Sequence, residues 1–189
     1  MGLLSVLFGR SKLRKPNREQ FFSIVTAESS LRGRTDLRTT EKAGIVFNPV
    51  ESTFFESLDS EIRDLLRISS DATGTRYEVV DDSHGTRWVV LDDRDFEDLV
   101  SIIHLVGETI TDHGFGDRML AAVFGFDYEG KKAYWIYSIK RGSFYPLVLS
   151  GDNERDNAAE MRLAAVMEED RIPVERDLTR WYALWGIPF

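Results

Sequence analysis

The sequence predicts an α+β domain in which amphipathic helices cover one face of a curved antiparallel sheet. Three observations lead to this prediction. Apolar residues recur at helical spacing in separate segments, a hairpin signal lies between two of those segments, and three strand-like segments follow one another with short connections. The 189 residues suffice for one such domain, and contents of 42% hydrophobic and 12% aromatic residues are typical of a chain with a packed core.

Four segments are expected to be helices. The clearest runs from about Asp95 to Asp112, because its apolar residues form one stripe, an aspartate can cap its first amides and Gly114 follows its last turn. The other three predicted helices are residues 20–28, 52–68 and 157–168. Two polar stretches beside them, residues 29–42 and 69–74, are predicted to be irregular.

A hairpin and a meander supply most of the predicted strands. Turn-forming residues at 81–85 separate the two hairpin strands, and short connections imply that the meander strands pair antiparallel. The strand-like segments are 43–47, 77–80, 86–91, 119–126, 133–140 and 144–149. The sequence leaves open whether they all belong to one sheet.

Charge is segregated along the chain. Residues 1–43 carry nine Lys/Arg and four Asp/Glu, a net of +5, while the remainder carries 15 basic and 28 acidic side chains, a net of −13. A basic arm on an acidic body suggests that the two parts have different partners. We therefore divide the chain into a basic, apolar N-terminal arm, residues 1–18, and a single α+β domain, residues 19–189.

The arm combines apolar side chains with cations, and two interpretations remain open. Its apolar residues could dock on the domain or on a partner subunit, or the arm could contact an anionic membrane surface, where each cation contributes about 1 kcal/mol. It matches neither a signal peptide nor the myristoylation pattern, in which Val6 would have to be Ser or Thr. The predicted membrane-contact residues are Leu3, Leu4, Leu7, Phe8, Arg10, Lys12, Arg14 and Lys15.

Composition excludes several classes of function. The absence of cysteine rules out a disulfide scaffold, thiolate metal sites and a cysteine nucleophile. The net charge of −8 argues against general nucleic-acid binding. No apolar run approaches the roughly 20 residues that a spanning helix needs. We expect a cytoplasmic protein that is peripheral at the inner membrane if the arm binds lipid.

Motifs for catalysis or metal binding are weak. His84 lies beside Asp81 and Asp82 in the predicted turn, where turn formation explains these residues better than a hydrolase site does. His104 and Glu108 share a helical face, but a third metal ligand is not evident, and His104 is expected to flank the core. We predict no catalytic residues, no metal and no cofactor, and hence a protein that is not an enzyme.

Two segments are candidates for contact with a protein partner. Lys140 and Arg141 form a basic turn that could bind an acidic group, although a solvated hairpin tip is the simpler explanation. Trp181 and Trp185 are spaced so that they could clasp a partner, whereas packing of the C-terminal tail across the domain is the alternative.

Several stretches together resemble the family of the PspA-associated protein PspAB. They are residues 7–12, 15–17, 43–51, 81–85, 88–91, 95–100, 114–116, 140–146, 155–157 and 180–188, with Asn48 in place of an expected basic residue. The resemblance implies an accessory or adaptor protein of a PspA- or HtpX-type system in membrane stress, and it supplies no catalytic residues. The order of elements is also similar to that of type III secretion chaperones and their YbjN-like relatives.

These observations favour a non-enzymatic adaptor in a phage-shock-type stress response. We expect it to bind a protein partner and the inner membrane surface, to bind no nucleic acid, and to be capable of forming a homodimer. The alternative is a chaperone-like peptide-binding module, and a hydrolase that uses Asp81, Asp82 and His84 is a weaker third hypothesis.

Overall fold

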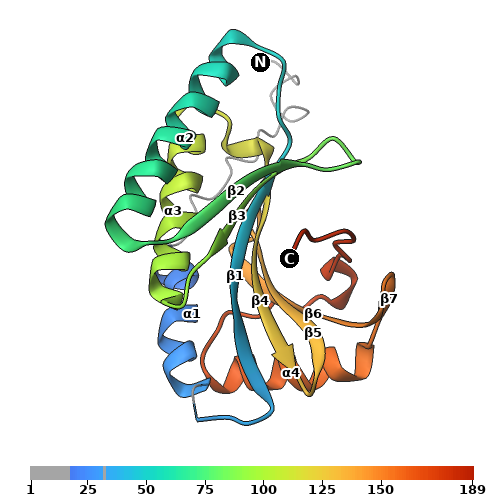
Figure 1. Ribbon diagram of the computed structural model, residues 1–189. Helices are drawn as coiled ribbons and strands as arrows, with labels where there is room; N and C mark the ends of the chain where they lie inside the picture. The colour runs from blue at the N-terminus through green and yellow to red at the C-terminus, as the bar shows by residue number, and fades with distance from the viewer. Residues whose placement is uncertain (1–17, 32) are drawn as a thin grey trace, which may run out of the picture.

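The computed structural model describes residues 18–31 and 33–189, which form a seven-stranded sheet in the order β2-β3-β1-β4-β5-β6-β7, with neighbouring strands antiparallel (Figure 1). The strands are β1 (Leu37–Phe47), β2 (Arg76–Asp81), β3 (Arg87–Asp92), β4 (Met119–Tyr128), β5 (Lys131–Ser138), β6 (Ser143–Gly151) and β7 (Glu154–Arg155). The α-helices are α1 (Arg18–Leu31), α2 (Thr53–Thr73), α3 (Phe96–Asp112) and α4 (Asn157–Glu169). The α+β class is therefore confirmed, and the predicted hairpin and meander belong to one sheet.

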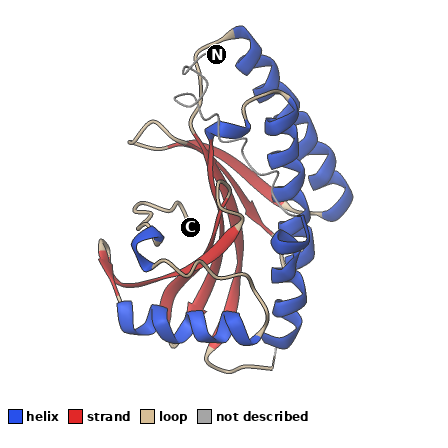
Figure 2. Cartoon of the chain, turned by 180° about the vertical axis from the view of Figure 1, so that it is seen from behind, coloured by secondary structure: helices blue, strands red, loops and turns tan. Residues whose placement is uncertain are grey.

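Both faces of the sheet are covered. Helices α1, α2 and α3 lie along one face, α4 crosses the lower end next to β6, and the C-terminal tail, residues 174–189, lies on the opposite face (Figures 1 and 2). Successive residues of β5 consequently enter two different cores: Trp135 and Tyr137 pack beneath the helices, and Tyr134 and Ile136 pack beneath the tail. This arrangement explains why the central strands are almost continuously apolar.

The most regular helix begins and ends where its sequence predicts. The side chain of Asp95 caps α3 by accepting a hydrogen bond from the Glu97 amide, and Gly114 follows the last turn with a φ of 81°. His113 Nδ1 donates a hydrogen bond of 2.9 Å to the Thr109 carbonyl, so the side chain satisfies an acceptor at the C-terminal end of the helix. The apolar stripe of α3 is buried against β1, which fixes the helix over the middle of the sheet.

Three predicted boundaries are wrong by three residues or more, and the first is the end of helix α1, which continues to Leu31 where residues 29–42 were predicted to be irregular. Strand β1 begins at Leu37, inside the stretch 29–42 predicted to be irregular; a break in its register with β4, between Thr39 and Ala43, interrupts the alternation that marks a strand. Helix α2 continues through Thr73 and ends only at Gly74, whose φ is 83°. The sequence did not indicate this last turn, because its residues are polar and exposed and show no apolar spacing. The two-residue strand β7 was not expected from the sequence.

Candidate functional site

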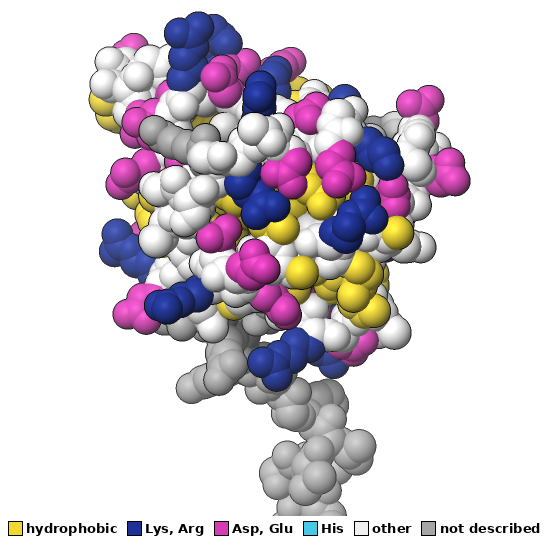
Figure 3. Space-filling model, turned by 90° about the horizontal axis from the view of Figure 1, so that it is seen from below, with side chains coloured by type: hydrophobic (Ala, Val, Ile, Leu, Met, Phe, Trp, Pro, Cys, Tyr) yellow, Lys and Arg dark blue, Asp and Glu magenta, His cyan; other side chains and the backbone are white. Residues whose placement is uncertain are grey.

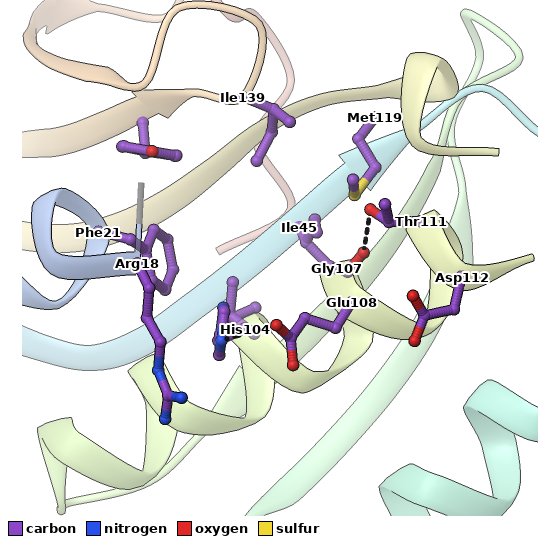
Figure 4. Close-up of a pocket in the computed structure, with 12 residues that line it drawn as sticks. Arg18, Phe21, Ile45, His104, Gly107, Glu108, Thr111, Asp112, Met119 and Ile139 are labelled. Atoms are coloured by element: carbon purple, nitrogen blue, oxygen red, sulfur yellow. Dashed lines mark hydrogen bonds and ion pairs between the residues drawn. The ribbon is translucent and has the colours of Figure 1, made fainter. Parts of the chain in front are cut away.

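A cavity of about 160 Å³ lies between α1 and α3, above strands β1, β4 and β5 (Figure 4). Its inner wall is apolar and consists of Phe21 from α1, Ile103 from α3, Ile45 from β1, Met119 from β4 and Ile139 after β5. The space is close to the roughly 150 Å³ that accommodates a benzene ring in a protein interior. The cavity can therefore hold one aromatic or branched aliphatic group.

A glycine in the middle of α3 opens this space. Gly107 lines the cavity, and a Cβ atom built on it would lie 3.6 Å from Ile45 Cδ1 and 3.6 Å from Met119 Sδ. Glycine inside a helix costs about 1 kcal/mol relative to alanine, although a methyl group would meet only ordinary contacts here. The absence of a side chain at Gly107 therefore leaves space beside α3 that a methyl group could occupy without a clash.

Two residues that line the cavity each carry a buried polar atom without a hydrogen-bond partner among the described residues. These atoms are the Tyr137 hydroxyl and His104 Nε2. His104 Nε2 lies 3.4 Å from Glu108 Oε1, but these atoms are not in hydrogen-bonding geometry. An unpaired buried polar group costs about 1–3 kcal/mol, and a polar atom brought into contact with either group would remove that cost.

Burial keeps both polar groups neutral. It raises the pKa of Tyr137 to about 12 and lowers the pKa of His104 from its usual value, so at pH 7 the tyrosine retains its proton and the imidazole is uncharged. Charge is confined to the mouth of the cavity, where Glu108 and Asp112 lie opposite Arg18 (Figure 4). The mouth thus carries two acids against one cation.

The same residues do not assemble a metal centre. His104 and Glu108 are neighbours on α3, as their spacing predicts, but residues 18–31 and 33–189 contain no group of three or more His, Cys, Asp or Glu side chains that could hold a metal ion. The cavity was not predicted from the sequence, because its two polar residues come from different elements. Gly107, a glycine inside a strongly amphipathic helix, was the one local signal that could have indicated it.

The hairpin residues of the weaker hydrolase hypothesis serve the turn. Asp81 pairs with Arg87 at 2.6 Å, and Asp82 accepts hydrogen bonds from the His84 and Thr86 amides and from the side chains of Thr86 and Trp88. Burial raises the pKa of Asp82, but these hydrogen bonds outweigh it and lower the value to about 2. The aspartate is thus an ionised turn-former.

The predicted partner-contact residues lie in two different environments. Trp181 is 6% exposed: its Nε1 donates to the Glu175 carbonyl at 2.9 Å, and its own carbonyl accepts from Arg155 at 2.6 Å. Trp185 is 36% exposed, and Lys140 and Arg141 are exposed at the β5–β6 turn. The two tryptophans therefore do not form one surface.

The basic turn contacts the C-terminal tail through Arg141 and Tyr182, and the sequence did not single out Tyr182. The Arg141 guanidinium lies 5.8 Å from the centroid of the Tyr182 ring and donates a hydrogen bond of 3.5 Å to its hydroxyl. Tyr182 and the nearby Leu178 are 58% and 53% exposed. We call Arg141, Leu178 and Tyr182 the tail surface. Seen from below, where α4 lies, hydrophobic side chains form only small patches among charges (Figure 3).

The predicted membrane-contact residues, Leu3 to Lys15, lie outside the described residues. The part of the chain that the structure describes contains no helix long and apolar enough to cross a membrane.

The described residues define an α+β domain with an apolar cavity on one side of its sheet and a docked tail on the other. Over residues 1–189 the sequence matches the model of the family PspAB, PspA associated protein B, and the chain belongs to this family. Comparison with curated proteins gives no match. Among solved structures, a phage SAM lyase in complex with S-methyl-5′-thioadenosine is 11% identical, with 51% of this chain and 88% of that chain covered and a TM-score of 0.26. So low a score gives no support for a shared fold or function.

Proposed function

We propose that this protein is a non-enzymatic accessory protein of a PspA-type membrane-stress system. Its domain binds a protein partner, and its arm contacts the anionic inner surface of the membrane. The observation that carries the proposal is the family match over all 189 residues, because the family is described by its association with PspA. The segregation of +5 and −13 net charge between the first 43 residues and the rest supports separate partners for the two parts.

The tail surface is the part of the domain best suited to a protein partner. Tyrosine and arginine are enriched among the residues that dominate binding energy at interfaces, and here Arg141 and Tyr182 are held against each other. An ion pair between Arg141 and Glu175, 3.9 Å from nitrogen to oxygen, further restrains the guanidinium. A restrained, exposed aromatic–cation pair loses little side-chain entropy on binding, which favours it as an anchor.

Binding to the PspA protein of the same organism tests this proposal. Titration calorimetry of the full chain with purified PspA should show a complex, and Tyr182→Ala should weaken its affinity by about tenfold or more, as expected for an interface anchor. Tyr77→Ala is the matched control, since Tyr77 is also an exposed tyrosine, 38% accessible, but lies on β2 at the other edge of the sheet. Absence of a complex with PspA would refute the partner, and equal affinity of the two variants would refute the surface. An HtpX-type protease is the second partner to titrate.

A further inference from the structure

We propose that the cavity between α1 and α3 holds the ring of Phe8, from the protein's own N-terminal arm, whenever the arm is not bound to a membrane. The cavity is an incomplete piece of core: its wall is apolar, and its two neutral polar groups, Tyr137 and His104, have no partner among the described residues. A segment of polypeptide would complete it, because it provides an apolar side chain together with backbone amides and carbonyls. The membrane half of this proposal rests on the function proposed above, whereas the docking half does not.

The position of the arm makes it the nearest candidate occupant. Arg18, the first residue of α1, itself lines the mouth of the cavity, so the chain preceding it starts there. Phe8 is ten residues earlier, and ten residues span at most about 35 Å when extended. The ring is therefore always within reach of the cavity, at a high effective concentration.

Size and lining select a single aromatic ring. The volume of about 160 Å³ admits one such group and not the whole apolar stretch of the arm. The wall already contains the rings of Phe21, His104 and Tyr137, and Phe21 lies 5.0 Å from Tyr137 and 5.9 Å from His104 between ring centroids. A further ring would add edge or offset contacts to this group.

Charge at the mouth matches the residues that follow Phe8. Glu108 and Asp112 give the mouth an acidic character, with Arg18 as its cation, and the arm carries Arg10, Lys12 and further cations immediately after the apolar stretch. The acidic mouth and the cationic arm carry opposite charges, which favours the arm over an acidic or neutral peptide as the occupant of the cavity. Because the ring cannot be in the cavity and in lipid at the same time, membrane binding must empty the cavity.

Disulfide trapping tests this docking directly, since the chain has no cysteine of its own. In the full chain, Gly9→Cys is paired with Glu108→Cys at the mouth; in the matched control it is paired with Glu97→Cys, an exposed glutamate on the same helix, about 16 Å along its axis. We expect the first pair to oxidise about tenfold faster than the second, because docking raises the local concentration of the two thiols. Phosphatidylglycerol vesicles should slow the oxidation of the first pair, and phosphatidylcholine vesicles should leave its rate unchanged.

Two added substitutions identify the ring and the cavity. Phe8→Ala removes the ring, and Gly107→Leu, made separately, fills the cavity from α3. Each should bring the oxidation rate of the first cysteine pair close to that of the control pair. Thermal melting should show that both variants are folded. Equal rates of the two pairs in the starting protein, or an unchanged rate in either variant, would overturn the docking. Disulfides formed only between two chains would assign the cavity to a second copy instead. Retained trapping that vesicles do not affect would overturn the competition alone.

Discussion

At the scale of single residues, buried charge is placed where separate parts of the chain meet. Glu160, on α4, is 2% exposed and accepts hydrogen bonds from Arg155 and from the Val148 amide of β6. Arg155 in turn donates to the Trp181 carbonyl at 2.6 Å. One ion pair therefore joins the last helix, the edge of the sheet and the tail, and removal of either partner would leave an unpaired charge in the interior.

Asp82 provides a test of the hairpin through pH. Its pKa in the folded protein is about 2, below the ordinary value of 3.8, so its hydrogen bonds stabilise the fold above pH 4 and are lost as the pH falls through 2. Asp82→Ala should lower the free energy of unfolding by about 1–2 kcal/mol at pH 7. The difference from the natural protein should narrow between pH 4 and pH 2, as measured by urea denaturation.

Ser83→Ala is the control for this substitution, because it alters an exposed residue of the same turn and leaves the carboxylate in place. It should cost little at any pH. A difference for Asp82→Ala that stays constant from pH 7 to pH 2 would show that the hydrogen bonds do not depend on the charge of the aspartate.

At the scale of elements, the parts with a local pattern were predictable and those shaped by distant contacts were not. Helix α3 and the β2–β3 hairpin follow from caps, turn residues and apolar spacing within each segment. After Leu37, the first residues of β1 are polar, and pairing with neighbouring strands makes them part of the sheet. The cavity likewise depends on His104 and Tyr137, which lie 33 positions apart in the sequence and meet only through packing.

The tail is an element whose position depends on a glycine in the sheet. A Cβ atom on Gly44 of β1 would lie 3.0 Å from Phe189 Cε1, 3.2 Å from the Val89 carbonyl oxygen and 3.3 Å from Trp88 Cε3. Gly44→Val should therefore lower the free energy of unfolding by about 1–3 kcal/mol, as overpacking does, and displace the end of the tail. Hydrogen exchange of peptides that cover residues 181–189 should become faster.

Phe189→Ala separates the tail from the strand in this experiment. Because the closest contact is with the Phe189 ring, the double variant should be less destabilised than the sum of the two single variants. Gly107→Ala, on the helical side of the sheet, should leave the exchange of the tail unchanged. Strict additivity of Gly44→Val and Phe189→Ala would place the strain in the sheet itself.

At the scale of the whole molecule, the described residues cover both faces of the sheet. Its second face, which a chaperone-like module would use, is covered by the protein's own tail: the Tyr134 hydroxyl donates to the Phe189 carbonyl at 2.8 Å, and Trp88 packs edge-on against the Phe189 ring. The tail surface and the N-terminal arm are consequently the features with which we expect the molecule to contact others. The arm is a prediction from the sequence alone, because charge segregation can be counted without a fold.

The arm gives the molecule a polarity that vesicle binding can measure. Replacing Arg10, Lys12, Arg14 and Lys15 with Gln in the full chain should weaken co-sedimentation with phosphatidylglycerol vesicles by more than about tenfold, since each cation contributes about 1 kcal/mol near an anionic surface. Higher salt should weaken binding of the natural protein as well, because the screening length falls from about 10 Å at 0.1 M to about 3 Å at 1 M.

A control with the same change in net charge decides whether the position of the cations matters. Arg63, Arg67, Arg76 and Arg94 are exposed on the domain, and their replacement with Gln removes four positive charges while leaving the arm intact. This variant should pellet with vesicles almost as the natural protein does. If both variants lose binding equally, total charge governs the attraction, and the arm has no separate role at the membrane. If only the arm variant loses it, the charge segregation seen in the sequence is what orients the acidic domain away from the lipid.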